Sequence, residues 1–221
     1  MNMIKRTAAS FLVAGLALLM LSAGAHAATI TLSNQGWTHG YQQGTIAGVR
    51  NVTVNAGQFS FTSSAGGTVE AFCIDVTTNL VTPGTYNPVA ASGHLTGTQL
   101  SLIGKLYDHY YASIVDSNTS AAFQLALWEI LYDPTGLNIT AGNFRATTAF
   151  GTGRATATNW LTGLASKDAL GLYELTVLKP TAPTSVNQTL ITAVKVPEPG
   201  TLALLGLGLL GAGAMRRRST R

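Results

Sequence analysis

The hydrophobic periodicity of the chain changes near Thr98, and this change limits the fold more than any other feature. Before residue 90, apolar and polar residues alternate at period two in short runs, which is typical of half-buried β-strands. The runs that predict strands are 28–32, 49–54, 58–62 and 68–76, and turn residues separate them at 55–57, 65–67 and 82–84. The first part of the chain is therefore predicted to form a β-rich layer.

Beyond Thr98 the apolar residues recur at helical spacing. Helices are predicted at 98–114, 117–132 and, from a weaker pattern, 156–166, and strand patterns return at 172–178 and 188–194. The second helix has capping residues at its start and would be stopped by Asp133-Pro134. We expect an α+β domain over residues 28–180, a sandwich-like β-rich layer with two or three inserted helices. Residues 181–196 suit either a linker or a last strand.

Residues 1–27 have the three parts of a secretory signal peptide. Lys5 and Arg6 give a positive start, residues 11–21 form a short apolar core, and Ala25-His26-Ala27 supplies the small-residue exit. The alternative is an N-terminal membrane anchor, but the apolar run is shorter than the roughly 20 residues that a spanning helix needs. Cleavage by signal peptidase is predicted after Ala27.

Residues 197–221 have the features of a membrane tail. Pro197-Glu198-Pro199 breaks the chain away from the preceding domain, because proline cannot continue a helix or a central strand. The Gly-rich apolar run 201–215 is at the short limit for a transmembrane helix. Arg216-Arg217-Arg218 follows, and a positive flank of this kind stays cytoplasmic. With the signal peptide, this topology places residues 28–196 outside the inner membrane.

The tail resembles the PEP-CTERM sorting signal, because the Pro-Glu-Pro motif, the Gly-rich apolar run and the arginine cluster occur in that family's order. The resemblance implies a Gram-negative host that makes exopolysaccharide. It also implies an exosortase-type transpeptidase that removes the tail near Pro197-Glu198-Pro199. The protein would then pass through the inner membrane and reach the cell surface or the extracellular matrix. A permanent single-span anchor is the alternative.

Charge and motifs exclude several functions for the domain. The net charge of +4 comes from the targeting ends, since residues 28–196 carry seven basic and eight acidic residues. Such a balance gives no phosphate-binding surface, so no nucleic-acid partner is expected. The chain has no G-x-S-x-G, H-E-x-x-H or phosphate-loop motif, and His39 and His94 have no neighbours at metal-ligand spacing. We therefore expect no enzymatic activity, cofactor or metal site.

Cys73 is the single cysteine of the chain, so no internal disulfide can form. It lies in the predicted strand 68–76, where Cys73 and Asp75 would share one face and Phe72 and Ile74 the other. An unpaired cysteine in an oxidising compartment requires an explanation. Three remain open, namely a covalent bond within the chain, a reduced and packed thiol, and a disulfide to another molecule.

Gln124 is a polar residue within the apolar helical run 121–128. A helix that is hydrophobic on every side is buried, and burying an amide without partners costs about 1–3 kcal/mol. Its amide could satisfy backbone groups of a neighbouring strand or loop. Alternatively, if the Cys73 face of the strand lies against this helix, the thiolate could attack the Gln124 carboxamide. Loss of ammonia would leave an internal thioester able to acylate an amine.

The pair resembles the thioester domains of bacterial surface adhesins. Their signature is an aromatic residue or Leu before Cys and, far downstream, a Gln with Trp four residues later. Phe72-Cys73 matches the first part and Gln124 with Trp128 the second, although Phe123 stands where the family usually has Thr. The resemblance implies that Cys73 is the thiol, Gln124 the acyl donor, and Phe72 and Trp128 the apolar shelter. It also implies a covalent amine partner on a surface or matrix.

Two functions are consistent with these observations. The first is a covalent adhesin, and the second is a non-reactive structural or carbohydrate-binding component of the exopolysaccharide matrix with the same fold. A base for Cys73 could come from His109, with Asp108 beside it, although a surface histidine is the plainer interpretation.

Overall fold

The computed structural model describes residues 28–181 and 186–196, so the predicted signal peptide and sorting tail lie outside the described residues. The strands are β1 (Ile30–Gly48), β2 (Val52–Ser63), β3 (Thr68–Cys73), β4 (Gly84–Ala90), β5 (Phe144–Ala146), β6 (Tyr173–Pro180) and β7 (Leu190–Lys195). The helices are α1 (Gly97–Tyr110), α2 (Ser117–Tyr132) and α3 (Gly153–Leu161), with short 3-10 turns η1 (Ala91–Gly93), η2 (Tyr111–Ser113) and η3 (Leu164–Ser166). No helix in these ranges is long and apolar enough to cross a membrane.

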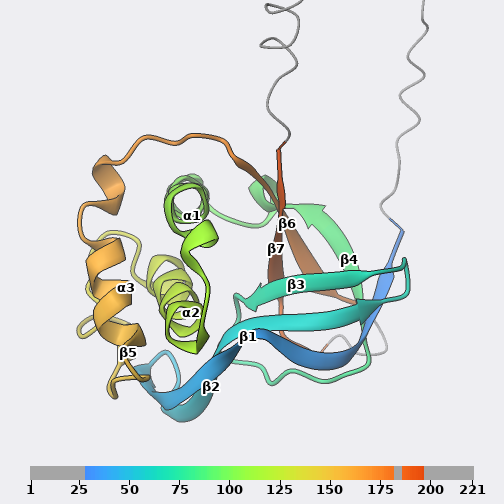
Figure 1. Cartoon of the computed structure of the whole chain (residues 1–221), viewed down its shortest axis with the longest axis horizontal. Coiled ribbons are helices and arrows are strands. Elements are labelled where there is room, and N and C mark those ends of the chain that lie inside the picture. Colours follow the sequence, from blue (N-terminus) through green and yellow to red (C-terminus); the bar gives the residue numbers. More distant parts are fainter. Residues whose placement is uncertain (1–27, 182–185, 197–221) are drawn as a thin grey trace, which may run out of the picture.

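The described strands form one antiparallel sheet in the order β2-β3-β7-β6-β4-β1-β5. Because β1 also pairs with β2, the sheet curves round and closes on itself. The helices gather on one side of the sheet (Figure 1), and α2 contacts β1, β2, α1 and α3. This arrangement confirms the predicted α+β class, a β-rich layer with inserted helices.

The predicted boundaries in the first part of the chain were wrong in two places. β1 is one long strand where only residues 28–32 were predicted, because register shifts at Ser33/Gly36 and Trp37/Tyr41 interrupt its alternation. The predicted turn at 55–57 lies inside β2, where Gly57 pairs with Tyr41. A Cβ at Gly57 would lie 2.6 Å from the carbonyl oxygen of Gly40. This glycine therefore allows close approach of two strands and does not mark a turn.

The central helix α2 coincides with the predicted helix at 117–132. Its N-cap is Asp116 and not one of the predicted capping residues 117–120. Asp116 accepts a hydrogen bond from the backbone N–H of Thr119, and the Thr119 hydroxyl accepts one from the Asp116 N–H. The helix ends at Tyr132, and Asp133 caps it before a proline. Every residue from Ser120 to Ile130 is buried. The prediction of a helix that is buried on all sides is therefore confirmed.

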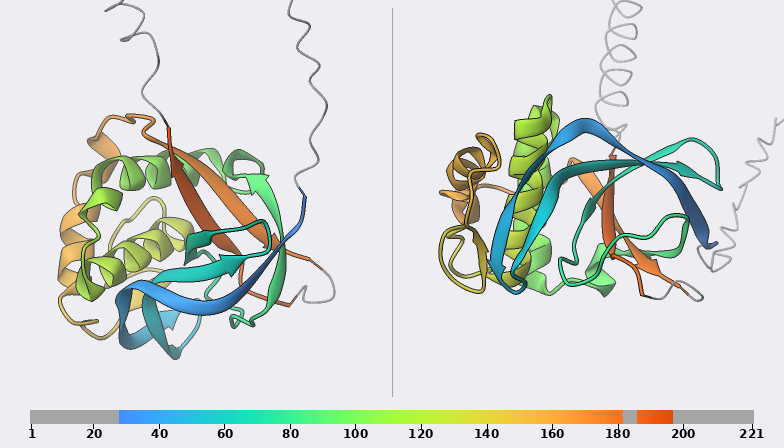
Figure 2. Two further views of the ribbon diagram at one scale, coloured as in Figure 1. Left: turned by 45° about the vertical axis from the view of Figure 1, so that its right-hand side comes forward. Right: turned by 90° about the horizontal axis from the view of Figure 1, so that it is seen from below.

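β7 lies within residues 181–196, the segment that was predicted to be either a linker or a last strand. It runs between β3 and β6, and β6 and β7 lie side by side in both views of Figure 2. Its register places Leu190 opposite Cys73 and Ile191 opposite Phe72. The end of the domain thus packs against the strand that carries the cysteine.

Candidate functional site

The Gln124 side chain is held by the backbone of Cys73. Its Oε1 accepts a hydrogen bond from the Cys73 N–H at 3.0 Å, and its Nε2 donates to the Cys73 carbonyl oxygen at 2.7 Å. Cys73 is 2% exposed and Gln124 is 1% exposed. The end of β3 and the middle of α2 therefore meet at these two residues. The expectation that the buried amide satisfies backbone groups of a neighbouring strand is confirmed.

This contact also polarises the carboxamide. The Cys73 N–H withdraws electron density from the Gln124 carbonyl, and a donor in this place stabilises the negative charge that develops on the oxygen when a nucleophile attacks. Because the bond is buried, its electrostatic effect is larger than it would be in water. The Cys73 N–H is thus placed as an oxyanion donor to the Gln124 carboxamide.

The Cys73 thiol is neutral in its surroundings. Its Sγ lies 3.1 Å from the Asp75 carbonyl oxygen, to which it donates, and 3.3 Å from the Asp75 N–H. Burial raises the pKa of the thiol to about 12, which outweighs the opposite effects of the Asp75 N–H and the nearby indole N–H of Trp128. A reaction at this sulfur must therefore remove the thiol proton during bond formation.

The Asp75 carboxylate is engaged elsewhere. Burial would raise its pKa, but hydrogen bonds from Thr77 and Thr78 hold the pKa below its ordinary value. The Thr77 N–H donates to Asp75 Oδ1 at 2.8 Å, and the Thr77 hydroxyl bonds the same oxygen. Asp75 is thus an ionised residue of the turn after β3, and its backbone rather than its carboxylate contacts the thiol.

A cavity of about 330 Å³ reaches Cys73 from the surface. Its described lining consists of Gln35, Trp37, Arg50, Val52, Thr53, Val54, Asn55, Phe59, Cys73, Val76, Asn79, Leu80, Thr82, Trp128 and Gln188. The ring of Trp37 lies 4.7 Å from those of Phe59 and Tyr41, centroid to centroid. The size is within the range of small-molecule sites, about 300–1,000 Å³, and the aromatic lining with scattered polar groups is typical of them.

Two polar atoms at this cavity are buried and have no hydrogen-bond partner among the described residues. They are Nε1 of Trp128, a donor, and Oε1 of Gln188, an acceptor. The other amide atom of Gln188 donates to the Thr78 carbonyl oxygen at 2.8 Å. Leaving such a group unpaired costs about 1–3 kcal/mol. Both atoms have almost no accessible surface, and the Trp128 indole N–H acts on the Cys73 thiol beside it.

Residues 195–218 match the PEP-CTERM protein-sorting motif. This match confirms the resemblance of the tail, and the motif implies processing by an exosortase and export to the cell surface. No curated protein matches the chain. Residues Pro197-Glu198-Pro199 of the sorting motif and the Arg216-Arg217-Arg218 cluster lie outside the described residues.

The fold is similar to bacterial thioester domains among solved structures. The N-terminal domain of the Streptococcus pyogenes pilus tip adhesin Cpa aligns with a TM-score of 0.45 and 14% identity, covering 75% of this chain and 99% of that one. The N-terminal thioester domain of a Clostridium perfringens surface protein aligns with a TM-score of 0.47 and 14% identity, covering 76% of this chain and all of that one.

The two predicted shelter residues lie in different places. Trp128 lines the cavity beside Cys73, whereas Phe72 packs on Phe123 of α2, with ring centroids 4.8 Å apart. The thioester hypothesis assumed that the Cys73 face of the strand, and not the Phe72 face, lies against the helix, and for Phe72 this assumption was wrong. Both faces of β3 are buried at its end, and Cys73 contacts α2 through its backbone groups. Phe72 therefore closes the helix side of the site and Trp128 the cavity side.

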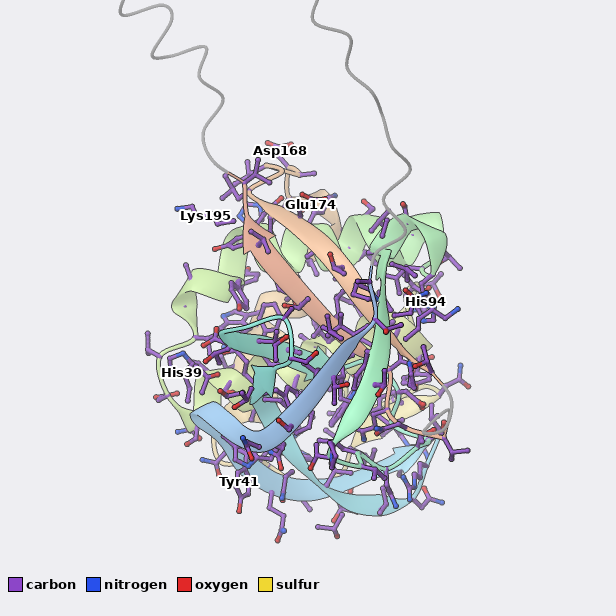
Figure 3. The ribbon with its side chains drawn as sticks, turned by 90° about the vertical axis from the view of Figure 1, so that its right-hand side faces the viewer. His39, Tyr41, His94, Asp168, Glu174 and Lys195 are labelled. Carbon is purple, nitrogen blue, oxygen red and sulfur yellow. The ribbon has the colours of Figure 1, made fainter. Side chains whose placement is uncertain are left out.

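The remaining candidates are accounted for without a role at Cys73. His109 Nε2 lies 2.9 Å from the Asp168 carbonyl oxygen, so the plainer interpretation of this histidine suffices. His39 and His94 lie on opposite sides of the molecule (Figure 3). Within the described ranges, no group of three or more His, Cys, Asp or Glu side chains is placed to hold a metal ion.

Sequence reasoning did not find Trp37, Arg50 and Gln188 as residues of the site. Trp37 lies in the irregular middle of β1, Arg50 in the turn after it, and Gln188 just before β7. They meet only because the sheet closes on itself and carries the last strand beside β3. Their one sequence signal is the aromatic Trp37 within a polar, Gly-rich segment.

Proposed function

We propose that this PEP-CTERM protein is a covalent surface adhesin in which Cys73 and Gln124 form an internal thioester. The observation that carries the proposal is the pair of hydrogen bonds by which the Cys73 backbone holds the Gln124 carboxamide. Signal peptidase would release the chain across the inner membrane of a Gram-negative cell. Exosortase processing would then leave it at the cell surface or in the exopolysaccharide matrix. Each molecule would react once, so the protein is not an enzyme.

The bond forms by exchange at one carbon atom. Cys73 Sγ bonds to Gln124 Cδ, the bond from Cδ to the amide nitrogen breaks, and the thiol proton leaves with that nitrogen as ammonia. When an amine attacks, a new N–C bond forms, the C–S bond breaks and the proton of the amine passes to the sulfur. In both steps the Cys73 N–H stabilises the charge on the carbonyl oxygen.

Burial would preserve the bond until a partner arrives. Cys73 and Gln124 are almost inaccessible to solvent, whereas the cavity reaches the sulfur from one side. The cavity wall beside Cys73 includes the apolar side chains of Trp128 and Phe59, and Gln124 does not line the cavity. A partner held in the same cavity would reach the Gln124 carbonyl carbon in place of water.

A second function is favoured by the same contacts. A thiol whose pKa is raised to about 12 and an amide with both hydrogen bonds made are also what an unreacted, packed pair would show. In that case the protein is a non-reactive matrix component, and the aromatic cavity binds carbohydrate without a covalent step. Mass separates the two functions.

The test is the intact mass of the full chain purified from the envelope. The proposal predicts one ammonia less than the sequence mass after allowance for processing, and addition of one whole methylamine with appearance of a free thiol. Cys73→Ala is the matched control, because it keeps the backbone groups that hold Gln124 and removes only the sulfur. It should show no deficit and no addition. If the wild-type chain has its full sequence mass and already reacts with thiol reagents, the thioester is absent and the matrix-component function is supported.

A further inference from the structure

We infer that the amine partner is a hexosamine unit of a polysaccharide, bound through the cavity beside Cys73 by its sugar ring and reacting through a free 2-amino group. This inference rests on the proposed thioester. It goes beyond that function because it names the partner from the cavity alone. The competing class of partner is a protein that presents a lysine side chain.

The shape and lining of the cavity suit a sugar ring. Trp37 and Phe59 form an apolar wall, and the exposed side chains of Gln35, Asn55 and Asn79 stand among its outer residues. A pyranose has one apolar face of C–H groups that packs on an aromatic ring, and hydroxyl groups around its edge that bond to amides. A lysine side chain is a narrow aliphatic stem and would leave both features unused.

The cavity also brings a bound ring near the reacting sulfur. Cys73 and Trp128 both line the cavity, and the indole N–H of Trp128 acts on the Cys73 thiol. A sugar ring packed on Trp37 and Phe59 therefore lies in the same cavity as the thiol.

The charge at the cavity also favours a sugar amine. Among its described lining residues Arg50 is the one charged side chain, held by hydrogen bonds to the Val76 carbonyl oxygen and Asn79 Oδ1. A lysine ammonium, with an ordinary pKa of about 10.4, would meet this positive charge and must lose a proton before it attacks. The 2-amino group of a hexosamine releases its proton more readily, because the ring oxygens withdraw electron density. A larger fraction of hexosamine molecules therefore reaches the cavity with an unprotonated amino group.

The experiment compares amines on the full chain. Methylamine, methyl glucosaminide and Nα-acetyl-lysine amide are added at equal concentration and pH, and intact mass gives the rate of addition. Each rate is divided by that of the same amine with a simple alkyl thioester, which removes differences in intrinsic reactivity. After this correction the glucosaminide should react about tenfold faster than the lysine probe, as expected for one aromatic contact and its hydrogen bonds.

Variants locate the effect in the cavity. Trp37→Ala should slow addition of the glucosaminide about tenfold more than it slows addition of methylamine, and Trp37→Phe should restore most of the loss. Trp160→Ala is the matched control, because Trp160 stacks on Tyr110 away from the cavity. It should change neither rate. The unreactive N-acetyl glucosaminide should slow methylamine addition to the wild type by occupying the cavity, a readout that needs no variant.

The outcomes separate the inference from the proposed function. A lysine probe that reacts as fast as the glucosaminide or faster, in a chain that adds methylamine, overturns the sugar partner and leaves the thioester standing. So does methylamine addition that the N-acetyl glucosaminide does not slow. A chain with no ammonia deficit and no methylamine addition overturns the thioester itself, and the inference with it.

Discussion

Two of the polar side chains that are buried on α2, Gln124 and Glu129, have different surroundings. Gln124 is 1% exposed and both ends of its amide are hydrogen-bonded to Cys73. Glu129 is fully buried, and neither of its carboxylate oxygens has a hydrogen-bond partner among the described residues. The two residues lie little more than one turn apart on one helix. Their difference therefore comes from what packs against each face of α2, not from the helix itself.

Gln124 meets the end of a strand, whereas Glu129 has the carboxylate of Asp133 near it. Burial and the charge of Asp133 raise the pKa of Glu129 to about 7, and the nearby N–H of Asn138 does not offset them. Glu129 also lies in the last turn of α2, where the helix dipole disfavours negative charge. A buried polar group on α2 is thus either matched to a partner or held in its neutral form.

The largest effect is expected from removing the matched group. Compared with the unreacted chain, in which the Gln124 amide is intact, Gln124→Leu keeps the approximate volume but leaves the Cys73 N–H and carbonyl oxygen buried without partners. We expect the free energy of unfolding to fall by about 3–4 kcal/mol, since each unpaired group costs about 1–3 kcal/mol. Urea titration of the purified chain measures this change.

Cys73→Ala provides the comparison for that loss, because it retains both backbone groups and removes only a small buried side chain. It should cost about 1–2 kcal/mol, as for other small cavities. If Gln124→Leu is no more destabilising than Cys73→Ala, the two hydrogen bonds contribute little and the contrast with Glu129 fails.

The next effect concerns pH. Because the pKa of Glu129 is raised in the folded chain from 4.5 to about 7, its neutral form is fully favourable below pH of about 4.5 and its stabilisation is lost as pH rises toward 7. Between pH 5 and pH 8 we expect the free energy of unfolding to fall by about 2–3 kcal/mol from this group. Chemical unfolding across this range measures the slope.

Glu129→Gln should flatten that slope and be more stable than the wild type at pH 8, since an amide carries no charge to bury. Glu174→Gln is the matched control, because Glu174 is an exposed carboxyl on β6 (Figure 3). Its loss should not change the dependence of the free energy of unfolding on pH. An identical slope in Glu129→Gln and wild type would show that Glu129 is solvated or paired.

The same contrast explains what the sequence could and could not predict. Gln124 could be singled out because it interrupts an apolar run, and α2 because capping residues at 117–120 and Asp133-Pro134 bound that run, although the N-cap itself, Asp116, was not predicted. Glu129 follows the run at a position where an acid is usually exposed, so its burial depends on the packing of the loop after α2, which no local pattern records. The pairing of Gln124 with Cys73 could be proposed only from the resemblance to thioester domains. The fold was needed to show that the two residues are in contact.

Local sequence patterns could not predict the cavity either, because its lining residues come from strands that are distant in the sequence. Trp37 belongs to a strand whose alternation is broken by register shifts, and Gln188 comes from the far end of the domain. Sequence reasoning could predict strands in both regions but not their adjacency, because pairing of β3 with β7 and of β1 with β2 is a property of the closed sheet. Strand identity is local, whereas strand order is not.

The smallest expected effect comes from a third polar residue on α2. Ser120 is fully buried, and its hydroxyl accepts a hydrogen bond of 2.8 Å from the Gln58 N–H of β2. It has one partner where Gln124 has two, so Ser120→Ala should lower the free energy of unfolding by about 1–2 kcal/mol, the cost of one unpaired backbone donor. Ser120→Thr keeps the acceptor but adds a methyl group to a packed interface, and should cost a similar amount through overpacking. Urea titration of both variants beside Gln124→Leu gives the test. A loss for Ser120→Ala equal to that for Gln124→Leu would mean that the number of partners does not set the stability contributed by buried polar groups on this helix.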